Sequence, residues 1–105
     1  MAAPILVMAT ASSREEAQTI AKALVEERLV ACVNIVPGVH SLFTWEGNFC
    51  NEDEVLLIMK THKNFFPALV SRIKTLHSYD VPEVIALPIL DGSEDYLAWM
   101  EASLT

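Results

Sequence analysis

The sequence predicts an α+β domain whose elements follow the order strand, helix, strand, strand, helix, strand, with a further helix at the end. Three observations support this prediction: the chain has only 105 residues, 52% of them are hydrophobic, and their spacing switches between helical and extended patterns. A domain of this size buries only about two-thirds of its unfolded surface, whereas soluble domains are about 45–50% apolar. We therefore expect one domain over residues 1–105, with an apolar face covered by another subunit.

The first strand is predicted from a continuous apolar run at residues 5–9, which is typical of a strand buried on both faces. A helix should follow, because Ser13 and Glu16 form a capping box in which each side chain satisfies a backbone N–H group. Beyond this box, apolar residues recur at the spacing of one helix face. They are Ala17, Ile20, Ala21, Leu24 and Val25.

A long β-hairpin is predicted next, from two β-branched and aromatic stretches at residues 30–45 and 49–61. Gly47 and Asn48 would form a type II′ turn between them. This turn would place Trp45 opposite Cys50, Ser41 opposite Glu54, and Cys32 near His62 or Lys63. Cys32 and Cys50 would then be too far apart for a disulfide, and we interpret both as small buried hydrophobic residues.

The length of this hairpin carries a consequence for assembly. Residues 30–46 would span about 55 Å when extended, whereas a compact domain of this size is about 35 Å across. The hairpin must therefore bend, and Pro37-Gly38 is the natural place for the bend. We expect the remainder to project and to pack on a neighbouring protomer.

The second half of the chain predicts a helix, a short strand and a final helix. The second helix should begin at Asn64 and tolerate Pro67 in its first turn. Its buried stripe would comprise Phe65, Leu69, Ile73 and Leu76. The fourth strand is expected at residues 84–87, and Ser93 should cap the last helix. This order is that of a ferredoxin-like β-α-β-β-α-β sandwich with an extra C-terminal helix.

Charge and composition exclude several classes of partner. Seven basic and 14 acidic residues give a net charge of −7, which repels nucleic acids and anionic membranes. Apolar runs are too short to span a membrane. The N-terminus lacks the positive segment of a secretory signal, and two cysteines suit a reducing compartment. We expect a cytoplasmic protein.

Motifs for catalysis are missing from the sequence. Glycine occurs only at positions 38, 47 and 92, so there is no phosphate-binding loop and no dinucleotide fingerprint. No G-x-S-x-G motif for a nucleophilic serine occurs either. The sequence therefore favours a binding protein over an enzyme.

Two features are candidates for a binding site. Residues 77–83 gather an imidazole, a phenol and two carboxylates in a loop before a strand, which suits either the polar edge of a cleft or a local turn. Lys60 ends an apolar strand. It would need a carboxylate such as Glu54 or Glu83, or a ligand anion, if buried, or it could extend its ammonium into water.

Several segments, in order, resemble the CutA-type divalent-cation tolerance proteins. The first is Ala31-Cys32-Val33-Asn34-Ile35-Val36-Pro37-Gly38, and the others lie at residues 41–47, 54–61, 77–83 and 95–99. The resemblance covers nearly the whole chain, from Ile5 to Leu104. It implies a ferredoxin-like homotrimer, similar in plan to PII-type nitrogen-regulatory trimers, and an association with copper tolerance and divalent-cation binding.

The resemblance also bears on the metal ligands. The copper site proposed in some members uses a cysteine that closes the first strand and a histidine from a pair after the second helix. Here Ala9 occupies the first place and Leu76-His77 the second. His77 and Glu83 are therefore the candidate ligands for copper or another divalent cation, which would be bound weakly.

These expectations combine into one hypothesis and two alternatives. The hypothesis is a non-catalytic homotrimer that responds to divalent metal ions. Its clefts between subunits would hold Trp45, Glu54, Lys60, Tyr79 and Glu83. One alternative is a PII-like sensor that binds a small anionic metabolite at Lys60. The other is a structural trimeric scaffold for other proteins.

Overall fold

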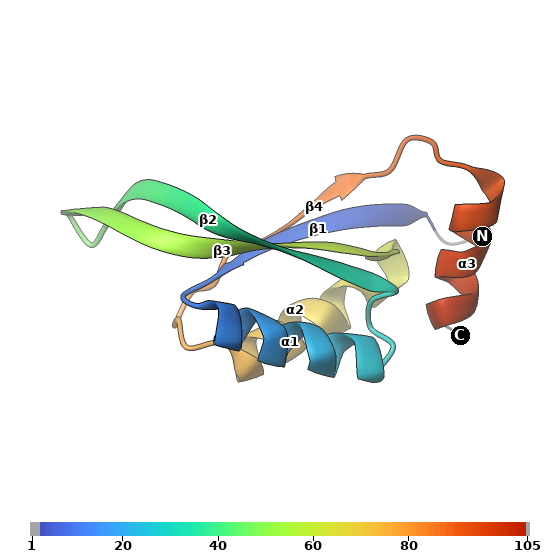
Figure 1. The fold of residues 1–105 in the computed structure, drawn as a ribbon, viewed down its shortest axis with the longest axis horizontal. Coiled ribbons are helices and arrows are strands. Elements are labelled where there is room, and N and C mark those ends of the chain that lie inside the picture. Colours follow the sequence, from blue (N-terminus) through green and yellow to red (C-terminus); the bar gives the residue numbers. More distant parts are fainter. Residues whose placement is uncertain (1–2, 105) are drawn as a thin grey trace.

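The computed structural model describes residues 3–104, and in this part of the chain four strands form one sheet beside three α-helices. The elements are β1 (Pro4–Ala11), α1 (Arg14–Glu26), β2 (Cys32–Trp45), β3 (Asn48–His62), α2 (Phe66–Leu76), β4 (Val84–Pro88) and α3 (Glu94–Leu104). The strand order is β2-β3-β1-β4, and all neighbours are antiparallel (Figure 1). The predicted α+β class and element order are confirmed.

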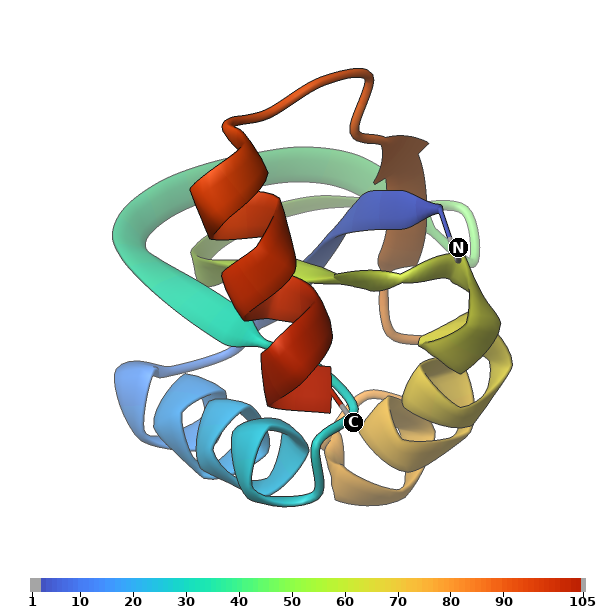
Figure 2. The ribbon, with the colours of Figure 1, turned by 90° about the vertical axis from the view of Figure 1, so that its right-hand side faces the viewer.

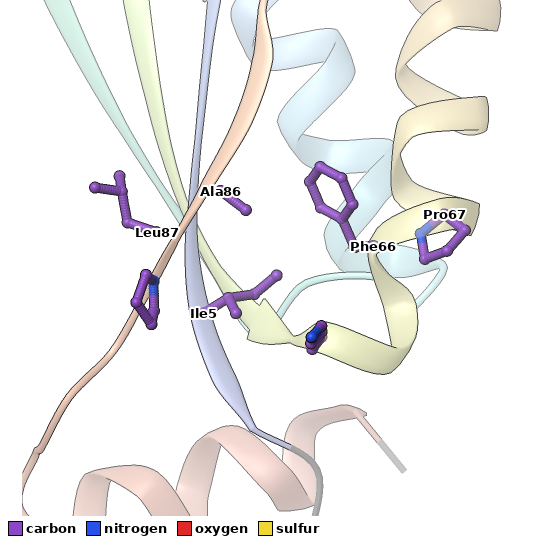
Figure 3. A pocket seen from close by; sticks show the side chains of 7 residues that line it. Ile5, Phe66, Pro67, Ala86 and Leu87 are labelled. Atoms are coloured by element: carbon purple, nitrogen blue, oxygen red, sulfur yellow. The ribbon is translucent and has the colours of Figure 1, made fainter.

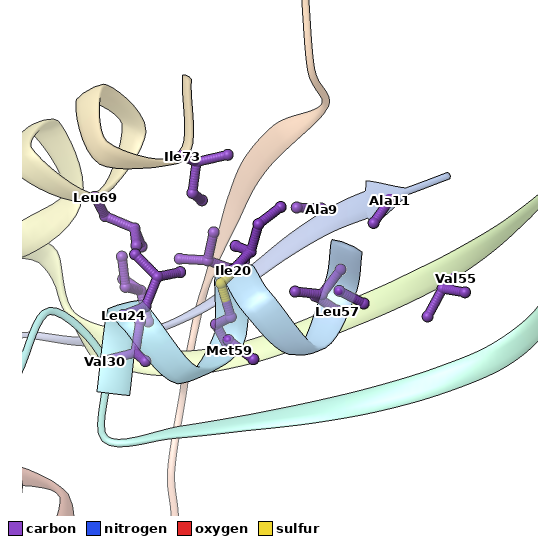
Figure 4. Close-up of a cluster of buried hydrophobic side chains, with 14 residues drawn as sticks. Ala9, Ala11, Ile20, Leu24, Val30, Val55, Leu57, Met59, Leu69 and Ile73 are labelled. Carbon is purple, nitrogen blue, oxygen red and sulfur yellow. The ribbon is translucent and has the colours of Figure 1, made fainter. Parts of the chain in front are cut away.

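The core lies between one face of the sheet and the two helices α1 and α2 (Figure 4). Strand residues alternate in direction, so Val7, Leu57 and Met59 point toward the helices and are buried. The helices contribute their own apolar stripes: Ala17, Ile20, Ala21 and Leu24 from α1, and Leu69 and Ile73 from α2. These stripes match the predicted ones at every fully buried position, but Val25, which was predicted in the stripe of α1, is 43% exposed.

The opposite face of the sheet differs from the prediction. The apolar run in β1 suggests burial on both faces, yet Leu6 and Met8 are only half-buried. The two helices that pack on the sheet, α1 and α2, both lie over the core face and not over the face that carries Leu6 and Met8 (Figures 1 and 2). The continuous apolar pattern of β1 is therefore satisfied on one side only within a single chain.

The start of α1 shows the expected cap with one change. Ser13 accepts a hydrogen bond on Oγ from the Glu16 N–H group, at 3.1 Å. The Glu16 carboxylate reaches back one residue further than the capping box predicts. It accepts from both the N–H and the hydroxyl of Ser12, each at 2.9 Å.

The predicted hairpin turn is wrong by one position. Trp45 pairs with Asn48, so Glu46 and Gly47 form the turn. Both have positive φ, 50° and 80°, the pattern of a type I′ turn. Gly47 suits either turn type, as the first central residue of type II′ or the second of type I′, so local chemistry did not distinguish them. Consequently Phe43 faces Cys50, Val39 faces Glu54 and Cys32 faces Lys60.

The predicted bend at Pro37-Gly38 is confirmed. The register between β2 and β3 shifts between Val36 and Val39, and Gly38 has a φ of +79°, which glycine adopts without strain. Beyond this bulge the hairpin projects from the sheet (Figure 1), and the molecule measures 44 × 25 × 23 Å.

The end of the chain packs separately. A short 3₁₀ turn, Lys63–Phe65, precedes α2, so α2 starts two residues after the predicted Asn64. Phe65 does not join the stripe of α2 but packs against a second small cluster, whose buried members are Ala31, Met100 and Leu104. The helix α3 lies across the end of the sheet (Figure 2). Its predicted cap is present, since Ser93 Oγ accepts from the Tyr96 N–H at 3.3 Å.

Candidate functional site

A pocket of about 800 Å³ lies at the base of the projecting hairpin. It is bordered by the end of β1, by the hairpin and by the loop that leads into β4. The lining residues are Thr10, Ser12, Ser41, Leu42, Phe43, Trp45, Cys50, Glu52, Glu54, Tyr79, Asp80, Val81 and Glu83. Four of these carry carboxylates and none is Lys, Arg or His, so the pocket favours cations.

Glu54 and Tyr79 form the polar centre of this pocket. Glu54 lies on β3 opposite Val39, and only 7% of it is exposed. The Tyr79 hydroxyl donates a 2.8 Å hydrogen bond to Glu54 Oε2. Burial and the hydrogen bond to the negative Glu54 raise the pKa of Tyr79 well above its ordinary value of 10, so this phenol remains a hydrogen-bond donor at neutral pH.

The loop that carries Tyr79 is fixed by His77. This side chain is 1% exposed, and its ring packs on that of Tyr79 with centroids 4.6 Å apart. Its Nε2 lies 2.7 Å from the Thr10 carbonyl oxygen, which only accepts, so Nε2 donates. Its Nδ1 accepts from the Tyr79 N–H at 3.0 Å.

Glu16 fixes the same loop from the other side. Besides its bonds to Ser12, its carboxylate accepts from the Ser78 N–H at 2.8 Å. Burial disfavours its charged form, but the hydrogen bonds from Ser78 and Ser12 outweigh burial and lower the pKa of Glu16 to about 2. The first turn of α1 and the loop before β4 are thus held together by one carboxylate.

Glu83 adds a second carboxylate to the pocket. Partial burial, and then the negative charge of Glu54, raise the pKa of Glu83 above its ordinary value of 4.5. Two carboxylates that repel each other are stabilised by a cation between them.

Of the predicted cleft residues, four line this pocket together and one does not. Trp45, Glu54, Tyr79 and Glu83 line it, whereas Lys60 does not. Lys60 lies six residues along β3 from Glu54, about 20 Å at strand spacing. Its ammonium donates to the Asn34 side chain and lies 4.0 Å from Cys32 Sγ. Among the described residues it forms no salt bridge with a carboxylate.

Sequence reasoning missed the pocket residues that come from other elements. Thr10 lies near the end of β1 and Ser12 just after it, while Phe43 and Glu52 lie on the hairpin. The alternation of strand residues could have shown that Glu52 and Glu54 share a face. Nothing local could have shown that Thr10 meets the loop at His77, because that contact joins positions 67 apart.

The two predicted metal ligands are placed differently. Glu83 lines the pocket, but His77 does not, and both of its ring nitrogens are engaged within the fold. His77 has no free lone pair in this conformation. Within residues 3–104, no group of three or more His, Cys, Asp or Glu side chains is arranged to hold a metal ion.

A second pocket, of about 450 Å³, lies between β4 and the start of α2 (Figure 3). Its walls are apolar apart from one lysine: Ile5, Lys63, Phe66, Pro67, Ala86, Leu87 and Pro88. Ile5 and Phe66 point into this space (Figure 3). It offers no cluster of polar groups, so the acidic pocket at the hairpin base is the candidate site.

A four-stranded antiparallel sheet with a projecting hairpin and an acidic pocket defines a small α+β binding domain. The sequence comparisons then give the family. The chain belongs to the CutA1 divalent ion tolerance protein family, which matches residues 5–103. The resemblance seen in the sequence is thereby confirmed.

Individual relatives agree with this assignment. The divalent-cation tolerance protein CutA of Thermus thermophilus is 54% identical over 95 residues, covering 90% of this chain and 92% of the relative. The chloroplastic CutA of Arabidopsis thaliana is 46% identical over 99 residues, which span 94% of this chain but only 54% of the relative. The crystal structure of CutA1 from Oryza sativa superimposes with a TM-score of 0.96 at 43% identity, covering 99% of this chain and 95% of that one.

The relatives differ in compartment. The Arabidopsis protein is described as chloroplastic, and the structure from Archaeoglobus fulgidus as a periplasmic divalent cation tolerance protein. No helix among residues 3–104 has both the length and the apolar character needed to cross a membrane. The family therefore does not assign one compartment to this chain.

Proposed function

We propose that this divalent-cation tolerance protein acts without catalysis, as a cytoplasmic homotrimer of ferredoxin-like protomers that binds a cation in a cleft between subunits. One observation carries the proposal: the pocket at the hairpin base is lined by four carboxylates, with no Lys, Arg or His in its wall. The carboxylates are Glu52, Glu54, Asp80 and Glu83. The cation is cargo that the protein binds and releases.

The trimer accounts for the apolar surface of the isolated chain. On the projecting hairpin, Leu42 is 61% exposed and Phe49 72% exposed. Ile85 and Leu87 on β4 are also exposed, beside the half-buried Leu6 and Met8 of β1. Exposed apolar residues on a sheet face and on a projecting hairpin are typical of a subunit interface. Further copies would cover it and complete the cleft.

The ligand types favour a weakly bound ion. Glu54 and Glu83 offer oxygen, and Ala9 and Leu76 remove the sulfur and one imidazole that copper prefers. Since one chain holds no group of three ligands among its described residues, water or a second copy would supply the remainder. Copper or another divalent cation would bind by this route, with His77 supporting the loop.

Neither alternative has a specific observation in its favour. A sensor of an anionic metabolite needs positive charge in its pocket, and the candidate site has the opposite sign. Lys60, the proposed anion ligand, lies at another part of the sheet and bonds to Asn34. A scaffold role would leave the acidic pocket without a use.

The proposal is tested in two steps with purified protein. Sedimentation equilibrium should give three times the 11.6 kDa mass of the chain, and a monomer would refute the assembly. Equilibrium dialysis with Cu²⁺ and Zn²⁺ should then show saturable binding that falls in Glu54→Gln and Glu83→Gln. Asp53→Asn, which removes a charge from the exposed neighbour of Glu54 on β3, should bind normally. Equal binding by all three variants would refute a role for this pocket.

A further inference from the structure

We propose that the same pocket also accepts an organic ammonium ion, namely a primary amine attached to an aromatic or other apolar group. This inference rests on the proposed function, because it requires the pocket to bind cations, and it adds the class of organic ligand. Three features of the pocket carry it: a buried carboxylate without a positive partner among residues 3–104, a threonine hydroxyl at the pocket surface without a hydrogen bond to those residues, and an aromatic wall.

The carboxylate belongs to Glu54. It is 7% exposed, and its one hydrogen bond comes from the neutral Tyr79 hydroxyl to Oε2. Every fully buried side-chain nitrogen or oxygen in residues 3–104 has a hydrogen-bond partner. Oε1 has none, so it retains an opening, and Glu54 lines the pocket. A buried carboxylate without a counter-charge is costly, and a cation in the pocket would remove that cost.

The hydroxyl belongs to Thr10. This residue is 8% exposed and lines the same pocket. Its carbonyl oxygen is engaged with His77, but its hydroxyl forms no hydrogen bond with any of residues 3–104. Since every fully buried side-chain oxygen in residues 3–104 has a hydrogen-bond partner, the unbonded Thr10 hydroxyl lies at the pocket surface. A primary ammonium has three N–H donors, so it can bond to Thr10 and to Glu54 together.

The rest of the wall suits a carbon skeleton better than a bare ion. Phe43, Trp45 and the Tyr79 ring contribute aromatic surface, and Leu42 and Val81 contribute apolar surface. Aromatic faces attract cations, most strongly when water is excluded. A hydrated metal ion would leave these walls unused. The volume of about 800 Å³ lies within the range of small-molecule sites, about 300–1,000 Å³.

Isothermal titration calorimetry of the full chain, in the oligomeric state it adopts in solution, tests this proposal. The probe is benzylamine at pH 7.5, and the comparison ligand is benzyl alcohol, which has nearly the same shape but no charge. We expect saturable binding of benzylamine at least about tenfold tighter than that of benzyl alcohol, the gain typical of a charge-assisted hydrogen bond. Equal binding of the two ligands, or none, would overturn the proposal.

Variants locate the site. Glu54→Gln and Thr10→Val should each weaken benzylamine binding, by about tenfold for Glu54→Gln, which removes the charge. Asp53→Asn is the matched control, since Asp53 has a 93% exposed side chain bonded to His40 and does not line the pocket. If Glu54→Gln fails to fold, Thr10→Val carries the test. Unchanged affinity in the folded variants would place the amine elsewhere and refute the proposal.

Metal titrations separate this inference from the proposed function. If Zn²⁺ or Cu²⁺ binds and benzylamine does not, the inference is wrong and the metal function stands. If benzylamine binds and neither metal does, the inference stands and the metal function is wrong. If each displaces the other, both are supported and share one site.

Discussion

The Tyr79 hydroxyl donates a 2.8 Å hydrogen bond to Glu54 Oε2, which joins the loop before β4 to the middle of β3. Glu54 is buried and carries its charge in a pocket that contains other carboxylates. The neutral phenol therefore stabilises a carboxylate that has no salt-bridge partner among residues 3–104. This pair is the clearest link between the fold and the proposed cation site.

Removing the Tyr79 hydroxyl should destabilise the protein. Tyr79→Phe retains the ring contact with His77 but removes the donor to Glu54, and leaving a buried acceptor without its partner costs about 1–3 kcal/mol. Urea denaturation at one fixed protein concentration measures the loss. In a Glu54→Gln background the same substitution should cost less, because the charge is gone. Equal losses in both backgrounds would show that the hydrogen bond contributes nothing.

Glu16 should make the protein sensitive to acid. Its pKa is lowered from 4.5 to about 2, so its stabilising effect is complete above pH 4.5 and disappears as the pH falls toward 2. A shift of this size corresponds to about 3 kcal/mol. Glu16→Gln should lower the melting temperature at pH 7. It should also flatten the dependence of the melting temperature on pH between pH 4.5 and 2. Glu15→Gln, at the exposed neighbouring position, should leave that dependence intact.

Glu83 should affect the pH dependence of stability in the direction opposite to Glu16. Its pKa is raised by partial burial and by Glu54, so the folded state holds this proton more tightly and stability falls as the pH rises from 4.5 through the raised value. Glu83→Gln should therefore raise the melting temperature at pH 7, and the gain should vanish below pH 4.5. Glu26→Gln on the exposed side of α1 serves as the control. A lower melting temperature for Glu83→Gln at pH 7 would contradict this account.

The hairpin turn offers a route to higher stability. Glu46 has a φ of +50°, which costs a residue with a side chain about 1 kcal/mol, whereas Asn tolerates this conformation. Glu46→Asn creates the Asn-Gly pair preferred in type I′ turns and should raise the free energy of unfolding by about 0.5–1 kcal/mol. Gly47→Ala should lower the free energy of unfolding. No atom lies near the Cβ position of Gly47, but its φ of +80° is one that residues with a side chain rarely adopt. No change in either variant would argue against the observed turn.

Much of the fold could be predicted from the sequence because the signals are local. The cap at Ser13 and the bend at Pro37-Gly38 each depend on residues within a few positions of one another, and both occur as predicted. The hairpin register could not be predicted in the same way. Gly47 fits two turn types, and choosing the wrong one moves every pair, including Cys32 and Lys60.

The candidate site was partly predictable. Family motifs drew attention to Trp45, Glu54, Tyr79 and Glu83, and these four line one pocket. Lys60 was grouped with them because a buried ammonium would need a carboxylate such as Glu54, but strand geometry separates the two along β3. Residues an even number of positions apart on a strand share a face, but they need not be close to each other.

By itself the sequence determined the elements, their order and the family of this protein, because spacing, caps and turn residues act over short distances. Only the tertiary structure decided that Thr10, Glu54 and Tyr79 meet around one pocket, and that both ring nitrogens of His77 form hydrogen bonds, to Thr10 and Tyr79. The contact between Glu54 and Tyr79 joins positions 25 apart, and the contact between Thr10 and His77 joins positions 67 apart. They depend on how the strands pair and how the loop packs, and no local pattern records that.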